Sequence, residues 1–217
     1  MTPEPRYRLR SGRGYGTHEA LIDLVQPGAR LLDVGAAGGY LSGIARDRKG
    51  ASVVALEPDP DSCVRARALG LDVLEGDVRA LIDAGDVADK GPYDQVLLAD
   101  VLEHTPEPDA VLRDLVGLLT PGGSVVVSLP NIAYALARLR LLRGVWRYER
   151  TGIFDDTHLR FFTRATAREM LERAGLRVEA ERHIGPASYA VGRPGMAVTR
   201  LRPGLLASQL VFLARLA

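Results

Sequence analysis

Short apolar runs alternate with amphipathic stretches through the first 131 residues of the chain. Apolar runs of strand length occur at residues 30–34, 52–56, 72–74, 95–99 and 125–129. Apolar positions recur at helical spacing in residues 17–25, 40–46, 61–69 and 109–119. Strands that alternate with helices at this interval predict βαβ units and a parallel sheet covered on both faces.

The pattern changes after residue 131. Residues 132–143 and 163–174 have helical periodicity, and residues 144–162 between them are irregular and rich in aromatic and charged side chains. Two more strands are predicted at 176–178 and 210–213, and the Gly- and Pro-rich residues 185–204 predict a long surface loop. The expected architecture is α/β, with a central, mostly parallel sheet of about seven strands and helices on both faces.

Composition narrows the class of protein. The chain has 217 residues, 47% of them hydrophobic, which suits a single core, and its net charge of +1 gives no global case for binding nucleic acid. Cys63 is the only cysteine, so neither an intrachain disulfide nor a thiolate metal cluster can form. Residues 1–10 resemble no signal peptide, and no apolar run has the roughly 18 residues of a membrane span. We therefore expect a cytoplasmic protein without a membrane span.

A glycine-rich turn follows the first predicted strand, in the sequence LLDVGAAGG of residues 31–39. A strand followed by a turn of small residues and then a helix lets a ligand approach the backbone at the helix N-terminus. The alternative is an ordinary tight turn with no role in binding. A dinucleotide fingerprint starting at Gly35 would need glycine at Ala37 and Tyr40. Asp33 would repel a pyrophosphate but can hold a cationic amino group, directly or through water. S-adenosylmethionine (SAM) carries such a group and no phosphate, so the turn favours SAM over NAD.

Two later carboxylates suit an adenosine moiety. Glu57 ends the second predicted strand and can accept hydrogen bonds from both ribose hydroxyls. NAD enzymes use a carboxylate in the same way, so Glu57 does not distinguish SAM from NAD. Asp77 follows the third strand and can accept from an adenine amino group. The alternatives are a solvated acid at the strand end and a turn aspartate.

The ordered motifs of residues 29–131 resemble class I SAM-dependent methyltransferases. They are DVG at 33–35, Glu57, GD at 76–77, YDQV at 93–96, LEH at 102–104 and LTPGG at 119–123, with Ala37 where the family commonly has glycine. The resemblance implies the Rossmann-like fold of that class and SAM as cofactor. It places the methionine portion at the glycine loop, the ribose at Glu57, the adenine edge at Asp77 and the sulfonium beside residues 99–102. The implied cofactor-binding residues are Asp33, Gly35, Ala36, Gly38, Gly39, Glu57, Pro58, Asp77, Val78, Ala99 and Asp100.

The second half of the chain resembles a narrower group. SLPN at 128–131 and TGIFDDTHLRFFT at 151–163 are similar to small methyltransferases related to ubiquinone-type O-methyltransferases. This similarity implies O-methylation of a small molecule in a secondary-metabolite or saccharide pathway, with N- or C-methylation as alternatives. An NAD-dependent oxidoreductase and a non-catalytic SAM-binding or scaffold protein are the rival hypotheses.

The expected organisation is one methyltransferase domain over residues 1–217. It would consist of an N-terminal segment and helix (1–28), a SAM-binding core (29–131), a substrate cap or lid (132–162) and a C-terminal helix and strands (163–217). The sequence does not fix the oligomeric state, and a homodimer is one option.

Three side chains are candidates for the chemistry at the methyl acceptor. Methyl transfer needs a well-placed nucleophile and, for a hydroxyl, a base. Asp100 and His104 follow the fourth strand and can border one pocket. His158 lies in the irregular segment, where Asp155 and Asp156 are expected to orient its imidazole and raise its basicity. We expect His158 to be the general base, ahead of His104, with loop packing as the alternative role of both.

We expect no catalytic role for the two remaining histidines and no metal site. His18 and His183 have no motif around them and are expected at the surface or at helix ends. Asp100 and Asn131 match positions used by magnesium-dependent catechol-type methyltransferases. Those enzymes have a second carboxylate where Pro130 stands, so we expect no metal.

Residues 132–143 form an arginine-rich helix in this prediction. Arg140, Arg143 and Arg147 share one face, and Ile132, Leu136, Leu139 and Leu142 share another. We expect the apolar face to pack over the sheet edge, with the basic side in solvent. A lid whose arginines meet an anionic substrate is one alternative, and attachment to an anionic membrane surface is another.

Overall fold

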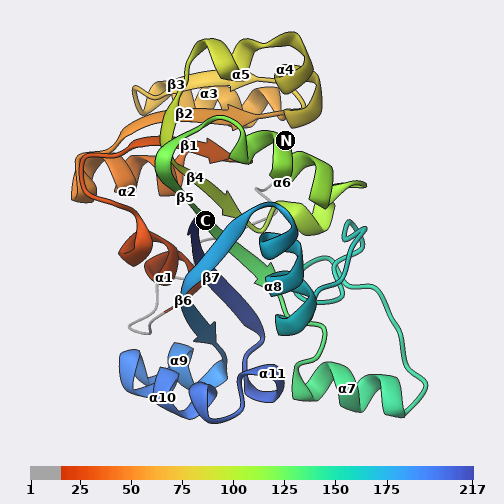
Figure 1. The fold of residues 1–217 in the computed structure, drawn as a ribbon. Coiled ribbons are helices and arrows are strands. Elements are labelled where there is room, and N and C mark those ends of the chain that lie inside the picture. The colour runs from red at the N-terminus through yellow and green to blue at the C-terminus, as the bar shows by residue number, and fades with distance from the viewer. Residues whose placement is uncertain (1–15) are drawn as a thin grey trace.

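The computed structural model describes residues 16–217 as a seven-stranded sheet flanked by helices (Figure 1). The strand order is β3-β2-β1-β4-β5-β7-β6, and β7 alone runs antiparallel to its neighbours. The strands are β1 (Arg30–Val34), β2 (Ser52–Glu57), β3 (Asp72–Glu75), β4 (Tyr93–Ala99), β5 (Leu119–Pro130), β6 (Leu176–Ile184) and β7 (Gln209–Leu216). The predicted mostly parallel sheet is confirmed.

Helices cover both faces of this sheet. They are α1 (Thr17–Leu24), α2 (Tyr40–Lys49), α3 (Pro60–Ala68), α4 (Val78–Ala84), α5 (Asp86–Asp89), the 3₁₀ turn η1 (Leu102–His104), α6 (Pro108–Val116), α7 (Ala135–Leu142), α8 (Arg164–Arg173), α9 (Pro186–Val191), α10 (Arg193–Leu201) and α11 (Pro203–Leu206). The helices α4 and α5 were not predicted.

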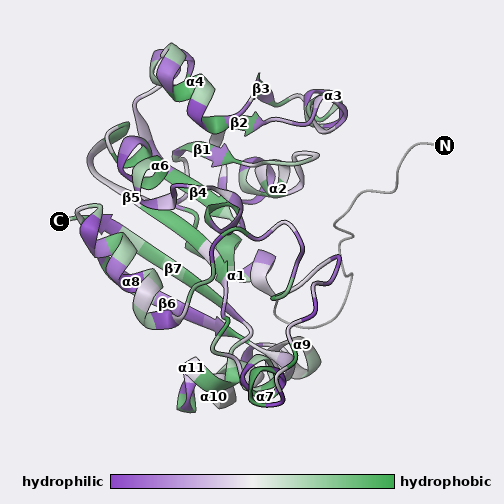
Figure 2. Cartoon of the chain, turned by 90° about the vertical axis from the view of Figure 1, so that its right-hand side faces the viewer, coloured by the Kyte–Doolittle hydropathy of each residue, from purple (hydrophilic) through white to green (hydrophobic). Residues whose placement is uncertain are grey.

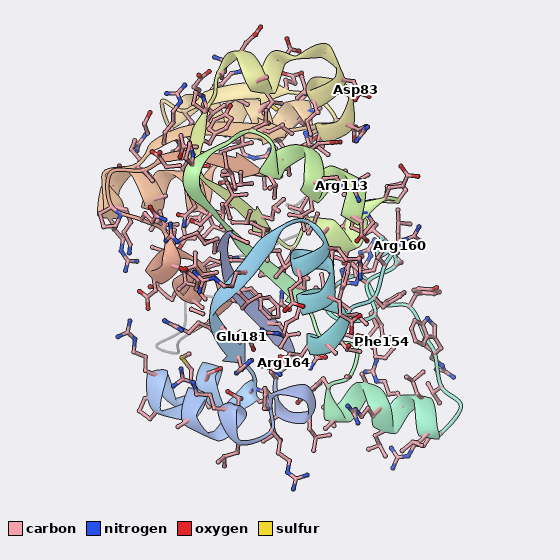
Figure 3. The ribbon with its side chains drawn as sticks, in the orientation of Figure 1. Asp83, Arg113, Phe154, Arg160, Arg164 and Glu181 are labelled. Carbon is pink, nitrogen blue, oxygen red and sulfur yellow. The ribbon has the colours of Figure 1, made fainter. Side chains whose placement is uncertain are left out.

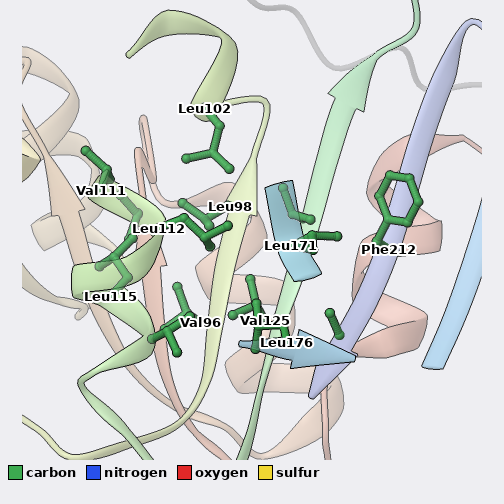
Figure 4. Close-up of a cluster of buried hydrophobic side chains, with 14 of the residues drawn as sticks. Val96, Leu98, Leu102, Val111, Leu112, Leu115, Val125, Leu171, Leu176 and Phe212 are labelled. Carbon is green, nitrogen blue, oxygen red and sulfur yellow. The ribbon is translucent and has the colours of Figure 1, made fainter. Parts of the chain in front are cut away.

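Alternate strand residues supply two separate hydrophobic clusters, because successive side chains of a strand point to opposite faces. In β4, Val96 and Leu98 join the cluster beneath α6 and α8 (Figure 4), whereas Leu97 joins the cluster beneath α1 and α2. The central strands β4, β5 and β7 are accordingly apolar along most of their length, whereas β6 at the edge of the sheet is largely hydrophilic (Figure 2). Burial on both sides fixes the register of the sheet and thereby the positions of the residues at its carboxyl edge.

The prediction of a loop over residues 185–204 is wrong, because α9, α10 and the start of α11 occupy this stretch. Pro186, Pro194 and Pro203 each stand in the first two positions of a helix. Proline is favoured there, since its missing N–H has no helical partner to lose. Gly192 separates two of the helices with a positive φ of 72°. The prolines begin helices here, and the sequence interpretation took them as breakers.

The prediction for residues 132–143 is wrong in two respects. The helix α7 ends at Leu142, and Gly144 follows with a φ of 67°, so Arg147 does not belong to its face. The apolar side does not pack over the sheet edge either: Leu136, Leu139 and Leu142 are 57%, 40% and 85% exposed. Among the described residues no helix is long and apolar enough to cross a bilayer. The expectation about residues 1–10 lies outside the described residues.

Candidate active site

Asp33 lies on β1, at the edge where the parallel strands end. Its side chain is 1% exposed, and the Ser42 hydroxyl donates a hydrogen bond of 2.5 Å to its Oδ2. Burial raises the pKa of Asp33 to about 7, against the effect of the Ser42 hydrogen bond, and the nearby Glu57 raises it further. A cationic group beside this buried carboxyl would stabilise its ionised form. The amino group of SAM is such a group.

The glycine loop of residues 35–39 is held by Glu57. The Glu57 carboxylate, 7% exposed, accepts from the Ala37 N–H at 2.7 Å and from the Asp59 N–H at 2.9 Å. Ala37 and Gly39 both have positive φ, of 48° and 79°. Alanine pays a conformational cost in this region that glycine avoids. The carboxylate expected at the ribose therefore also fixes the loop.

The other predicted cofactor residues share the same edge of the sheet. Asp77 caps α4, with Oδ1 accepting from the N–H groups of Arg79 and Ala80 at 2.9 and 3.3 Å. Pro58 is exposed after β2 and Val78 is half-buried after β3. Gly35, Ala36, Gly38 and Gly39 follow β1, and Ala99 ends β4. Ligands of open α/β sheets bind beyond this carboxyl edge.

Asp100 connects three strands. Its Oδ1 accepts from the Ser128 hydroxyl at 2.6 Å and from the Gln209 side-chain amide, and its own N–H donates to Ser128 Oγ at 3.1 Å. Burial raises the pKa of Asp100, and the Ser128 hydrogen bond opposes that rise. Its φ of 55° is rare outside glycine and marks a constrained backbone at the site. These contacts favour a positioning role for Asp100 rather than proton transfer.

His104 and His158 lie together. Their ring centroids are 4.8 Å apart, and His158 is 9% exposed. Nδ1 of His104 is 3.2 Å from the Thr157 carbonyl oxygen, and Nδ1 of His158 is 3.2 Å from the Ile153 carbonyl oxygen. Because a carbonyl only accepts, each neutral ring carries its proton on Nδ1 and leaves a lone pair on Nε2. Either Nε2 can therefore accept a proton.

Burial outweighs the effect that we expected a neighbouring carboxylate to have on the basicity of His158. Burial lowers the pKa of His158, and His104 lowers it further, against smaller opposite effects from the Ile153 carbonyl, Asp155 and Asp100. The Asp155 carboxylate instead accepts from the N–H and the hydroxyl of Thr157, at 2.8 and 2.6 Å. It shapes the loop and leaves the imidazole neutral.

Glu103 was missed as a candidate. It is 1% exposed, and in residues 16–217 neither of its carboxylate oxygens has a hydrogen-bond partner. Burial raises its pKa well above the usual value, and the charge of Asp100 adds to this rise. One donor atom from each of Glu103, His104 and His158 lies within 4.8 Å of the other two. Two imidazoles with one carboxylate at this spacing can hold a divalent cation.

Asn131, one of the two metal positions considered from the sequence, is engaged in the fold. Its amide donates to the Ala207 carbonyl at 2.8 Å, and its Oδ1 accepts from the Ala133 N–H at 3.0 Å. Gln209 and Glu103 had no separate signal in the sequence, although Glu103 directly precedes His104 in the LEH motif. Their roles emerge only when the strands are assembled.

The irregular residues 144–162 fold back over the carboxyl edge. The N–H groups of Leu159 and Arg160 donate to the Glu103 carbonyl at 2.8 and 3.0 Å. Trp146 packs edge-on against Phe154 and Phe161, each at 5.1 Å between ring centroids. Phe154 and Arg160 lie on this segment beside α8 and α6 (Figure 3). The segment thus covers the side of the sheet on which the two histidines meet.

Of the two other histidines, His18 lies near enough to Asp100 for their charges to interact, as do those of His104 and His158, whereas His183 lies on β6. His18 is exposed in the first turn of α1, as expected, and its ring is 5.9 Å from that of Tyr40. The prediction for His183 is wrong: it is buried on β6, and its Nε2 lies 2.8 Å from the Glu181 carboxylate. Glu181 and His183 are two residues apart and so share one face of β6, but this part of the strand was not predicted.

The geometry agrees with the family to which the sequence is similar. The family model described as a methyltransferase domain matches residues 15–181. The chain belongs to this methyltransferase family. The family, the Rossmann-like fold, an enzyme of the methyltransferase type and SAM as its cofactor, all expected from the sequence, are thereby confirmed.

Curated relatives carry a more specific name. A ubiquinone biosynthesis O-methyltransferase of Xanthomonas campestris pv. campestris is 40% identical over 119 residues, which are 51% of this chain and 48% of the relative. The ubiquinone biosynthesis O-methyltransferase of Xanthomonas oryzae pv. oryzae is 39% identical over 123 residues, which are 54% of this chain and 50% of the relative. The chain spans about half the length of the curated relatives it matches.

Solved structures share the fold at low identity. Magnesium protoporphyrin IX methyltransferase of Synechocystis PCC 6803, with bound SAH, is 17% identical with a TM-score of 0.63, covering 93% of this chain and 82% of that one. A SAM-dependent methyltransferase of Thermotoga maritima, a possible histamine N-methyltransferase, is 15% identical with a TM-score of 0.62, covering 92% and 89%. At this identity the likeness establishes the fold alone.

Proposed function

We propose that the protein transfers the methyl group of SAM to a hydroxyl oxygen of a small molecule, with His158 as the general base. The observation that carries this proposal is the pair of imidazoles beyond β4, each with its Nδ1 against a backbone carbonyl of residues 144–162, which leaves its Nε2 outside that contact. The relatives named O-methyltransferase support oxygen as the methylated atom. A secondary-metabolite or saccharide pathway is the part of this proposal that rests on the sequence resemblance, and a cytoplasmic location is an expectation from the apolar pattern of the sequence.

SAM, when bound, supplies a methyl group already activated by its sulfonium. Asp33 would hold the amino group, Glu57 the ribose hydroxyls and Asp77 the adenine edge, all at the carboxyl edge of the parallel strands. Gly35 and Ala36 both donate N–H hydrogen bonds to the Leu56 carbonyl, at 2.8 and 3.0 Å, which holds the loop in place for this task. The chain's work is to orient the acceptor and remove its proton.

His158 suits the base because it is neutral and shielded. Burial lowers its pKa, so its Nε2 is unprotonated at neutral pH without help from a carboxylate. The ring of His104 lies beside that of His158, at 4.8 Å between centroids, and lowers the pKa of His158 further. Arg143 and Arg147 are exposed, so an anionic acceptor draws no support from them.

The decisive experiment compares His158→Ala with His104→Ala at saturating SAM. Loss of a general base typically costs about 100-fold or more in turnover. We expect that loss for His158→Ala, a smaller loss for His104→Ala, and an unchanged SAM dissociation constant in both. Because the pKa of His158 is lowered, the acid limb of the pH–rate profile should fall below the pKa of about 6.5 of a free histidine.

Three results would count against this function. Near-normal turnover of His158→Ala would remove the base and leave proximity as the source of rate. A rate abolished by a chelator and restored by a divalent cation would replace base catalysis by metal assistance at Glu103, His104 and His158. Binding of SAM without turnover on any acceptor would favour the scaffold hypothesis.

A further inference from the structure

Exposed apolar side chains are concentrated on α7 and the turn that follows it. Twelve large hydrophobic residues are exposed among those described, and seven of them fall between Leu136 and Tyr148. Leu142 is 85% exposed, Tyr148 60% and Trp146 39%. A patch of this kind on a folded protein marks a surface that is covered by something else.

The leucines form one stripe on α7. Leu136, Leu139 and Leu142 follow at every third position, on the side of the helix opposite Ala137, which is 1% exposed and the only buried residue of α7. The helix therefore touches the rest of the molecule through its small residue and presents its large ones outward. This is the reverse of an ordinary surface helix.

The same segment is strongly basic. Residues 132–150 contain five arginines and one acid, Glu149, which pairs with Arg140 at 2.5 Å. Arg138, Arg143, Arg147 and Arg150 are all exposed. The whole chain has a net charge of only +1, so this local excess of four positive charges is a property of the segment. A leucine stripe flanked by arginines is the pattern of a helix that lies in the interface of an anionic membrane.

A second apolar and basic point lies at the same end of the molecule. The helices α7, α10 and α11 share that end in both views (Figures 1 and 2). Leu201 at the end of α10 is 78% exposed, between the exposed Arg200 and Arg202. The α7 segment and the end of α10 can therefore contact the same flat surface.

We propose that this end of the protein binds the surface of an anionic lipid bilayer. Leu136, Leu139, Leu142 and Trp146 would enter the interface, and the exposed arginines would meet lipid phosphates. The charge excess favours an anionic partner, and the leucine stripe favours one with an apolar layer beneath its charge. A nucleic acid offers no such layer for leucines. Binding is at the surface, without a span.

The test uses the full chain and two kinds of vesicle, phosphatidylcholine alone and an equimolar mixture with phosphatidylglycerol. Trp146 is the only tryptophan, so its fluorescence reports on this patch directly. We expect co-sedimentation and a blue shift with the anionic vesicles, both weakened by salt, and neither with phosphatidylcholine alone. The assay does not depend on methyl transfer, so it is independent of the proposed function.

Variants assign the binding to the patch. Each basic residue near an anionic surface contributes about fivefold, so Arg143→Gln with Arg147→Gln should lower the partition coefficient about 30-fold. Leu139→Ser with Leu142→Ser should abolish the blue shift. The matched controls are Val64→Ser on α3 and Arg177→Gln on β6, at exposed positions of 64% and 68%. Circular dichroism and SAM affinity confirm that each variant is folded.

The proposal fails if the wild type binds neither vesicle, or if the leucine and arginine variants bind as tightly as the controls. It also fails if the wild type forms a dimer that does not bind vesicles and if Leu142→Ser dissociates this dimer. In that case a second copy of the chain covers the stripe.

Discussion

Asp33 couples the cofactor site to pH at the scale of a single residue. Its folded-state pKa of about 7 lies above that of an unfolded aspartate, so the folded protein holds a proton that the unfolded chain releases. Without a ligand, the stability due to Asp33 is therefore full at low pH and is lost as the pH rises from about 4 to about 7. A cationic group beside the carboxylate reverses the preference, because it favours the charged form.

SAM binding should accordingly release a proton. Below about pH 7 the affinity should rise roughly tenfold per pH unit and then level off, as the carboxylate becomes ionised in the free protein. Calorimetry in buffers of different ionisation enthalpy measures this proton release. In Asp33→Asn both the release and the pH dependence should vanish. An affinity that is flat across this range in the wild type would place the amino group elsewhere.

Glu181 joins α8 to β6 at the scale of elements. Its carboxylate accepts from Arg164 at 2.7 and 2.9 Å, from His183 at 2.8 Å and from Arg168 (Figure 3). Burial would raise the pKa of Glu181, but these hydrogen bonds outweigh it and lower the pKa to about 2. A depressed pKa contributes stability above the unfolded value, which is lost as the pH falls from about 4.5 toward 2.

Glu181→Gln should therefore destabilise the protein at pH 7 by about 2 kcal/mol, an amount reduced by the partial exposure of both arginines. Urea unfolding at several pH values measures this, and the gap from wild type should narrow as the pH falls below about 4.5 and close near pH 2. Glu179→Gln, which removes a more exposed acid of the same strand, is the control. If both variants lose the same free energy of unfolding, the hydrogen bonds of Glu181 contribute no more stability than the ion pairs of Glu179.

The sequence predicted the elements that depend on local periodicity and missed those that depend on partners. Val96, Leu97 and Leu98 predict a buried strand because a parallel strand is apolar on both faces. Pro186 and Pro203 misled the prediction, because proline marks both a loop and a helix start. The exposure of Leu142 and the orphaned carboxylate of Glu103 depend on what lies opposite, which periodicity does not encode.

At the scale of the whole molecule, residues 144–162 are an irregular segment that packs on the rest of the protein through a few buried side chains, Phe154 among them. Phe154, 4% exposed, lies edge-on to Trp146 and beneath the Arg140 guanidinium, 5.1 Å from its ring centroid. The segment has no helix or strand of its own, so its order depends on such contacts. Segments of this kind open at lower free energy than the core.

Phe154→Ala should loosen this segment and spare the sheet. Removing a buried phenylalanine costs about 3–5 kcal/mol where it is packed in a core, and here the loss is expected to act locally. Amide hydrogen exchange should accelerate across residues 144–162 and stay slow in β4, with a lower turnover and an unchanged SAM affinity. Phe154→Leu should retain most of the protection. Uniform acceleration throughout the chain would instead make Phe154 part of the global core.

The place of β7 in the sheet has a consequence for synthesis. β7 lies between β5 and β6, although it follows both in the chain. As the protein leaves the ribosome, one edge of β5 stays open and β6 has no strand to join until residues 209–216 emerge. An open, apolar strand edge invites pairing with other chains. The nascent protein is thus open to such pairing from the time β5 emerges until β7 has joined the sheet.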